Sequence, residues 1–173
     1  MSVNDTIETI ALFSALGAGV VAGVFYAFSS FVMEALARMP VDQGIRAMQM
    51  INITVINPWF FLVFFGTALG AMIVMAYGWL HLESPGAAGL ITGGTTYLVG
   101  TILVTGLRNV PLNNKLAKVD PASAEGGTVW KMYLRRWTAW NHLRTAASVA
   151  ATVLLVLALQ CPGFQKKICL AKH

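Results

Sequence analysis

The amino-acid sequence predicts an all-α integral membrane protein: a four-helix bundle with a short amphipathic helix between helices 1 and 2. The chain of 173 residues is 57% hydrophobic and 11% charged, whereas a soluble domain contains about 25% charged residues. Its hydrophobic residues fall into four long runs that are almost free of charge. Each run is long enough to cross the ~30 Å hydrocarbon core of a bilayer as a helix.

We expect one domain, residues 1–173, with membrane spans at about residues 9–33, 59–80, 86–107 and 137–160. A chain this short leaves no room for a second domain. The residues before the first hydrophobic run contain no Lys or Arg, so they do not resemble a cleavable signal peptide. The first helix is therefore expected to be retained.

The first two helices have recognisable boundaries. Asp5 and Glu8 have the spacing of a capping box, with Asp5 as the N-cap, and Pro40 ends the first long helix. Residues 42–56 form an amphipathic pattern with Ile45 and Met48 on its apolar side. This short helix is expected either to lie in the membrane interface or to fold under the bundle.

The remaining helices follow from caps and prolines. Asn57-Pro58 and Ser84-Pro85 each predict an N-cap followed by a helix start. Pro111 disfavours helix at the residue before it, so we expect a break at Asn109. Thr128 is the expected N-cap of a last helix that runs to Gln160.

The basic residues predict the topology. Of the 12 Lys and Arg residues, nine lie in or next to the segments that join helices 1–2 and 3–4, and three lie in the C-terminal tail. The positive-inside rule places these two segments in the cytoplasm and both termini in the periplasm of a bacterial inner membrane. Cys161 and Cys169 both lie in the tail, where a disulfide and two free thiols remain equally open.

The net charge of +5 is explained by these orientation signals, so we expect no nucleic-acid partner. Membrane lipid is the expected environment. Gly19 and Gly23 have the small-xxx-small spacing that allows close helix contact. A homo-oligomer or a partner in a membrane complex is therefore an open possibility.

A polar, aromatic stretch from Tyr133 to Ser148 is the candidate functional region. On a helix, its members spaced by three or four residues share one face; they are Tyr133, Trp137, Asn141, Arg144 and Ser148. Asn52, Asn109 and Asn113 fall near the same cytoplasmic end of the bundle. We expect a pocket there for a small hydrophobic aromatic or lipid-like ligand.

Simpler roles exist for several of these residues. Arg144 could extend to the headgroups, Trp59 and Trp130 could belong to an interfacial aromatic belt, and Asn109 could cap a helix break. His142 is rotated about 100° from Asn141 on a helix. The spacing of His, Cys, Asp and Glu matches no familiar metal site, so we expect no metal and no cofactor.

Several segments resemble a known family. They are Phe25-Tyr26-Ala27-Phe28-Ser29-Ser30-Phe31-Val32-Met33, residues 47–52 and 57–60, Asn109-Val110-Pro111-Leu112-Asn113-Asn114-Lys115-Leu116-Ala117, and Arg136-Trp137-Thr138-Ala139-Trp140-Asn141-His142-Leu143-Arg144-Thr145. Together they resemble the anthrone oxygenase-like membrane family, also called domain of unknown function 1772. The sequence departs from the pattern at Glu34, where a proline is expected.

The resemblance implies a small four-helix membrane enzyme, a monooxygenase that oxidises an anthrone-like or hydroquinone-like aromatic with O2 and without metal or flavin. It implies His142 as base, Arg144 with Asn141 or Asn113 as partners of the enolate oxygen, and Trp137 and Trp140 as stacking surfaces. Asn52 and Asn109 would complete the substrate-binding set. Two alternatives remain: a non-enzymatic scaffold or accessory subunit, and a binder of a quinone-like or lipid ligand.

Overall fold

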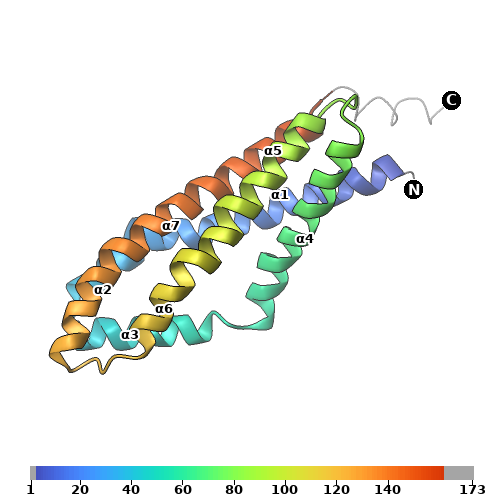
Figure 1. The fold of residues 1–173 in the computed structure, drawn as a ribbon. Helices are drawn as coiled ribbons and strands as arrows, with labels where there is room; N and C mark the ends of the chain where they lie inside the picture. The colour runs from blue at the N-terminus through green and yellow to red at the C-terminus, as the bar shows by residue number, and fades with distance from the viewer. Residues whose placement is uncertain (1–2, 162–173) are drawn as a thin grey trace.

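The computed structural model describes residues 3–161 and contains four long helices packed side by side (Figure 1). Four helical stretches are long and apolar enough to cross a membrane: Val3–Arg38, Pro58–Leu80, Ala87–Ala117 and Ala124–Leu159. No strand occurs among the described residues. The predicted all-α architecture with four membrane helices is confirmed. Cys169 lies outside the described residues. The choice between a Cys161–Cys169 disulfide and two free thiols therefore also falls outside them.

The first long helix consists of α1 (Val3–Ala27), a π-helical turn η1 (Phe28–Val32) and α2 (Met33–Arg38). Because α1 already includes Val3, Asp5 lies in the first helical turn and is not the N-cap that we predicted. A carboxylate there still favours the positive end of the helix dipole. Arg38 pairs with Glu34 on the exposed side of α2, and the helix ends before Pro40 as expected.

The amphipathic helix α3 (Val41–Thr54) folds under the bundle. Ile45 and Met48 are buried in one hydrophobic cluster with Trp130. Gly44 permits this close approach, because a Cβ there would lie 2.8 Å from the carbonyl oxygen of Leu36 and 3.1 Å from Trp130 Cζ2. Trp130 is therefore an internal residue, and its assignment to an interfacial belt is wrong.

The second span, α4 (Pro58–Leu80), begins as predicted, with Asn57 Oδ1 accepting a hydrogen bond from the Phe60 backbone N–H at 3.0 Å. The helix α5 (Ala87–Tyr97) starts later than predicted. Gly86, with φ of 87°, occupies its N-cap position, and Ser84 and Pro85 lie in the turn before it. Glycine adopts this left-handed conformation without steric cost, so the chain can reverse its direction just before α5 begins.

The third span does not break at Asn109. α5 continues through two π-helical turns, η2 (Leu98–Leu103) and η3 (Thr105–Asn109), into α6 (Val110–Ala117). Pro111 lies in the first turn of α6, directly after η3, and it has no backbone N–H to donate to the preceding turn. The π-helical turn just before it changes the local hydrogen-bonding pattern, so the chain stays helical where the sequence predicts an end.

The last helix, α7 (Ala124–Leu159), begins before the predicted start at Val129. Ser123, not Thr128, is the N-cap, and its Oγ accepts a hydrogen bond from the Gly126 backbone N–H at 2.9 Å. Gly126 packs against the Asp120 carbonyl oxygen so closely that a Cβ would clash with it. Gly126 and Gly127 therefore belong to the first turn of α7, where the predicted N-cap at Thr128 would have left them outside the helix.

One end of the bundle contains the start of α1, the end of α4, the start of α5 and the end of α7 (Figure 1). Tyr77 Oη donates a hydrogen bond to Asn4 Oδ1 at 2.8 Å and ties α4 to α1 there. α2, α3 and α6 lie at the opposite end. The polar stretch of α7 runs from that opposite end into the middle of the bundle.

Candidate functional site

The central part of α7 turns a polar, aromatic face into the bundle. Its residues are between 0% and 5% exposed: Tyr133, Trp137, Asn141, Arg144 and Ser148. The shared face that the spacing predicts is therefore confirmed as a buried face. Arg144 does not extend to the headgroups, because its side chain turns inward toward α1 and η3.

Asn141 joins α7 to the first helix. Its Nδ2 donates hydrogen bonds to the Phe25 carbonyl oxygen at 2.7 Å and to Ser29 Oγ at 2.8 Å. Its Oδ1 accepts a hydrogen bond from Arg144 Nη2 at 2.7 Å. The amide is thus held at both ends, which gives it one fixed orientation beside the guanidinium.

Arg144 is surrounded by neutral groups. Its Nη1 donates to Thr105 Oγ1 at 3.1 Å, and its Cζ lies 4.1 Å from the ring centroid of Phe25 and 5.2 Å from that of Trp137. No carboxylate pairs with Arg144 within residues 3–161. Hydrogen-bonding dipoles and aromatic faces therefore stabilise this buried charge in place of a counter-ion.

Three buried polar atoms in this region have no hydrogen-bond partner: Asn109 Oδ1, Trp137 Nε1 and Arg144 Nε. Asn109 contacts the helix that carries the other two, because its Nδ2 donates to the Trp137 backbone carbonyl oxygen at 3.2 Å. A buried polar group left unpaired costs about 1–3 kcal/mol, and such groups are rare in native proteins. This region therefore contains two buried donors and one buried acceptor without a hydrogen-bond partner.

Tyr133 connects this cluster to a second polar group nearer α3 and α6. Its ring stacks on Trp137, with centroids 5.8 Å apart. Its hydroxyl donates to Asn113 Oδ1 at 2.8 Å and accepts a hydrogen bond from Asn52 Nδ2 at 3.4 Å. Asn52 and Asn113 thus belong to the same region of the bundle, although none of their observed hydrogen bonds joins them directly to Arg144.

Three π-helical turns border the buried face of α7. Ser29 in η1 bonds Asn141, Thr101 in η2 shares a 2.8 Å hydrogen bond with Ser148, and Thr105 and Asn109 lie in η3. π-helical turns occur frequently at functional sites, where the extra residue redirects a side chain. Phe25, Ser29 and Thr105, which contact Asn141 or Arg144, are not among the site residues that the sequence predicts.

A signal for part of this set exists in the sequence. Thr101, Thr105 and Asn109 recur at four-residue spacing in the second half of the third span. This spacing indicates a polar stripe on a helix. The Phe25 carbonyl that bonds Asn141 has no comparable signal, because a backbone group is present at every residue.

His142 and Trp140 do not join the Arg144 cluster. His142 is exposed on the outside of α7, as its rotation of about 100° from Asn141 requires. Trp140 is partly buried, and the Arg108 guanidinium lies over its ring at 4.9 Å from the centroid. The histidine expected to be the base is therefore separated from the groups expected to hold the enolate oxygen.

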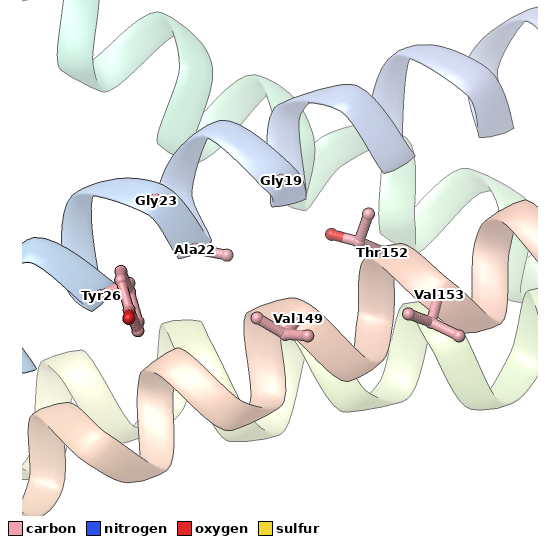
Figure 2. A pocket seen from close by; sticks show the side chains of 7 residues that line it. All are labelled: Gly19, Ala22, Gly23, Tyr26, Val149, Thr152 and Val153. Atoms are coloured by element: carbon pink, nitrogen blue, oxygen red, sulfur yellow. The ribbon is translucent and has the colours of Figure 1, made fainter.

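A pocket of about 290 Å³ lies between α1 and α7 (Figure 2). It is lined by Gly19, Ala22, Gly23, Tyr26, Val149, Thr152 and Val153. None of the predicted site residues lines it. Of the two glycines expected to form a close helix contact, Gly23 leaves space here, since a Cβ there would meet no atom within 4 Å, whereas a Cβ at Gly19 would lie 3.7 Å from Thr152 Cγ2.

No group of three or more His, Cys, Asp or Glu side chains that could hold a metal ion occurs among residues 3–161. Fold and site together define an integral membrane protein of four helices, with a buried guanidinium held by amides, hydroxyls and aromatic rings. Residues 59–154, more than half of the chain, match the family model of anthrone oxygenase. The chain belongs to the anthrone oxygenase family, and the resemblance seen in its sequence is confirmed. No curated protein and no solved structure matched the chain.

Proposed function

We propose that this protein is an oxygenase that uses O2 to oxidise an electron-rich aromatic of the anthrone type within the membrane. The observation that supports this most directly is Arg144, a buried cation without a carboxylate partner among the described residues. Membership of the anthrone oxygenase family supports this substrate class. The aromatic rings of Phe25 and Trp137 beside the guanidinium suit a flat ligand.

The reaction requires a site that stabilises an anion. An anthrone loses one proton from its ring methylene and becomes an enolate, with negative charge on the former carbonyl oxygen. Arg144 Nε and Trp137 Nε1, both unpaired, are the donors available to that oxygen. In a site of low dielectric constant, fixed donors stabilise such a charge far more than water does.

The remaining steps balance with O2 alone. The enolate carbon forms a bond to O2, and the resulting peroxide takes up the proton that was released. Loss of water from this hydroperoxide leaves a new carbonyl group. One oxygen atom of O2 is retained in the quinone, the other leaves in water, and both methylene hydrogens leave with it.

In this mechanism, water accepts the proton that the ring methylene of the anthrone loses. The Arg144 cluster holds no carboxylate or histidine among the described residues, and His142 lies on the outside of α7. Stabilising the enolate makes this proton easier to lose, so a strong base in the site is not required.

The test is the oxidation of an anthrone by purified protein in lipid nanodiscs under O2. The rate of anthraquinone formation and the incorporation of one labelled oxygen atom from ¹⁸O2 are measured. We expect Arg144→Met to lower the rate about 100-fold, a typical cost of losing an oxyanion donor. Arg135→Met, which changes an exposed arginine of the same helix, is the control and should stay within about twofold.

Two results would contradict the proposal. Wild-type protein that is no faster than autoxidation would exclude oxygenase activity on this substrate class. A normal rate in Arg144→Met would remove Arg144 from the chemistry.

A binder of a quinone-like ligand is the second candidate, favoured by the absence of a base in the cluster among residues 3–161. The same preparation separates the two functions, because a binder holds anthraquinone in an Arg144-dependent manner without forming it.

A further inference from the structure

We infer that Asn109 determines ligand specificity: its Oδ1 selects ligands that carry a free hydroxyl in addition to the oxygen held by Arg144 and Trp137. This inference rests on the proposed function and adds a requirement to it. The ligand class is a planar aromatic carbonyl compound whose ring bears a hydroxyl that is not hydrogen-bonded to its own carbonyl group.

The orientation of the Asn109 amide is determined by its backbone partner. Asn109 is 1% exposed, and its Nδ2 donates to the Trp137 carbonyl oxygen at 3.2 Å. A carbonyl accepts hydrogen bonds and cannot donate them, so the nitrogen must face Trp137 and Oδ1 must face away. Oδ1 is the atom without a partner.

An amide oxygen can be satisfied only by a donor. Among the described residues, Asn109 Oδ1 is the only buried side-chain acceptor without a partner, and the other two unpaired atoms, Trp137 Nε1 and Arg144 Nε, are donors. A ligand with a single carbonyl satisfies the donors but leaves Oδ1 unpaired. A ligand with a carbonyl and a separate hydroxyl satisfies all three.

The three atoms lie around one residue. Asn109 bonds the backbone of Trp137, and the Arg144 guanidinium lies 5.2 Å from the centroid of the Trp137 ring. The inference places one ring system beside Trp137, where it meets both the acceptor and the donors. Sites that bond a hydroxyl of their ligand reject analogues without it, because the buried partner is left unpaired.

The experiment compares two probes of nearly equal shape, 2-hydroxyanthraquinone and 2-methoxyanthraquinone. Only the first has a donor, and its hydroxyl is too far from the carbonyl for an internal hydrogen bond. Binding to the wild-type protein in nanodiscs is measured by calorimetry at a mildly acidic pH, where the phenol stays protonated. We expect the hydroxyl compound to bind about tenfold more tightly, as one added buried hydrogen bond predicts.

The matched variants are Asn109→Leu and Asn114→Leu. Asn109→Leu removes the acceptor at similar volume. It should reduce the preference for the hydroxyl compound to about twofold or less, because the hydroxyl compound loses its added hydrogen bond. Asn114, exposed on α6, is the control, and Asn114→Leu should keep the wild-type preference. The wild-type comparison needs no variant, so it decides the question even where Asn109→Leu fails to fold.

Equal affinities in the wild type, a preference that survives in Asn109→Leu, or no binding of either probe would each overturn the inference. Failure of the inference differs from failure of the proposed function. Equal affinities together with Arg144-dependent oxidation would refute selection by Asn109 and leave the oxygenase in place. A tenfold preference without oxidation would refute the oxygenase and leave the binding site.

Discussion

Arg144 brings a positive charge into the middle of the bundle, where its partners are Asn141, Thr105 and two aromatic rings. A charge within a membrane span is costly, and such residues are usually retained for function. A carboxylate beside it would neutralise the charge. Because Asn141 contributes an uncharged amide oxygen instead, the guanidinium keeps its full charge for a ligand.

Asn141→Asp tests this point with one atom changed. The new carboxylate would lie at hydrogen-bond distance from Arg144 Nη2, since Asn141 Oδ1 is 2.7 Å from it. We expect the oxidation rate to fall about 100-fold, as for loss of an oxyanion donor, although Arg144 is still present. Asn114→Asp, on the exposed side of α6, should leave the rate unchanged. Full activity in Asn141→Asp would show that the charge of Arg144 is not used.

His142 provides the complementary test of the base. Its side chain is exposed on α7, so His142→Ala should oxidise an anthrone within about threefold of the wild-type rate. A general base typically contributes 10²–10⁴-fold. A rate lowered by that amount would restore His142 as the base and require α7 to rotate during turnover. Steady-state rates over a range of anthrone concentrations distinguish this from weaker binding.

At the scale of the element, the π-helical turn η3 decides which side chains face α7. It ends with Asn109 and contains Thr105, and these residues reach Trp137 and Arg144 respectively. An irregular backbone is tolerated within a membrane only where protein groups satisfy it. We interpret η3 as the feature that aims Asn109 into the bundle.

Deleting Leu107, an exposed residue of η3, tests this interpretation. Removal of one residue should convert the π-helical turn to α-helix, which leaves the flanking helices in place but changes the directions in which the side chains of η3 point. We expect normal helical content by circular dichroism and loss of anthrone oxidation. Deleting Leu82, in the turn between α4 and α5, is the control and should retain activity. An active Leu107 deletion would show that η3 does not position the site.

At the scale of the whole molecule, exposed basic residues gather at the end formed by α2, α3, α6 and the start of α7. They are Arg38, Arg46, Lys115, Lys118, Lys131, Arg135 and Arg136. The positive-inside rule therefore predicts that this end faces the cytoplasm. The turn between α4 and α5 would then face the periplasm.

Cysteine labelling in spheroplasts checks this orientation. In a chain with Cys161 and Cys169 replaced by Ser, Glu83→Cys should react with a membrane-impermeant maleimide, because Glu83 is exposed in the turn between α4 and α5. Lys118→Cys, exposed just after α6, should react only after the membrane is opened. The reverse pattern would mean that the tail lysines, not the two loops, determine the topology.

The sequence by itself determined the features that depend on local pattern. Four apolar runs predict four membrane helices. The spacing of apolar or polar residues predicts which face of a helix is buried, as for Ile45 and Met48 in α3 and for Trp137, Asn141 and Arg144 in α7. These predictions hold because hydropathy and helical periodicity act within a single segment. They predicted Asn109, Asn141 and Arg144 as candidate site residues, and all three are buried in the structure.

Only the tertiary structure decided the contacts between distant segments. The Phe25 carbonyl that accepts from Asn141 is 116 positions away, and nothing local to either residue indicates the pair. The π-helical turns and the unbroken helix through Pro111 occur where these segments pack against α7. Packing within the same bundle buries Trp130. The energy of these contacts is realised only when the helices assemble, and it can outweigh the local preferences that sequence patterns report.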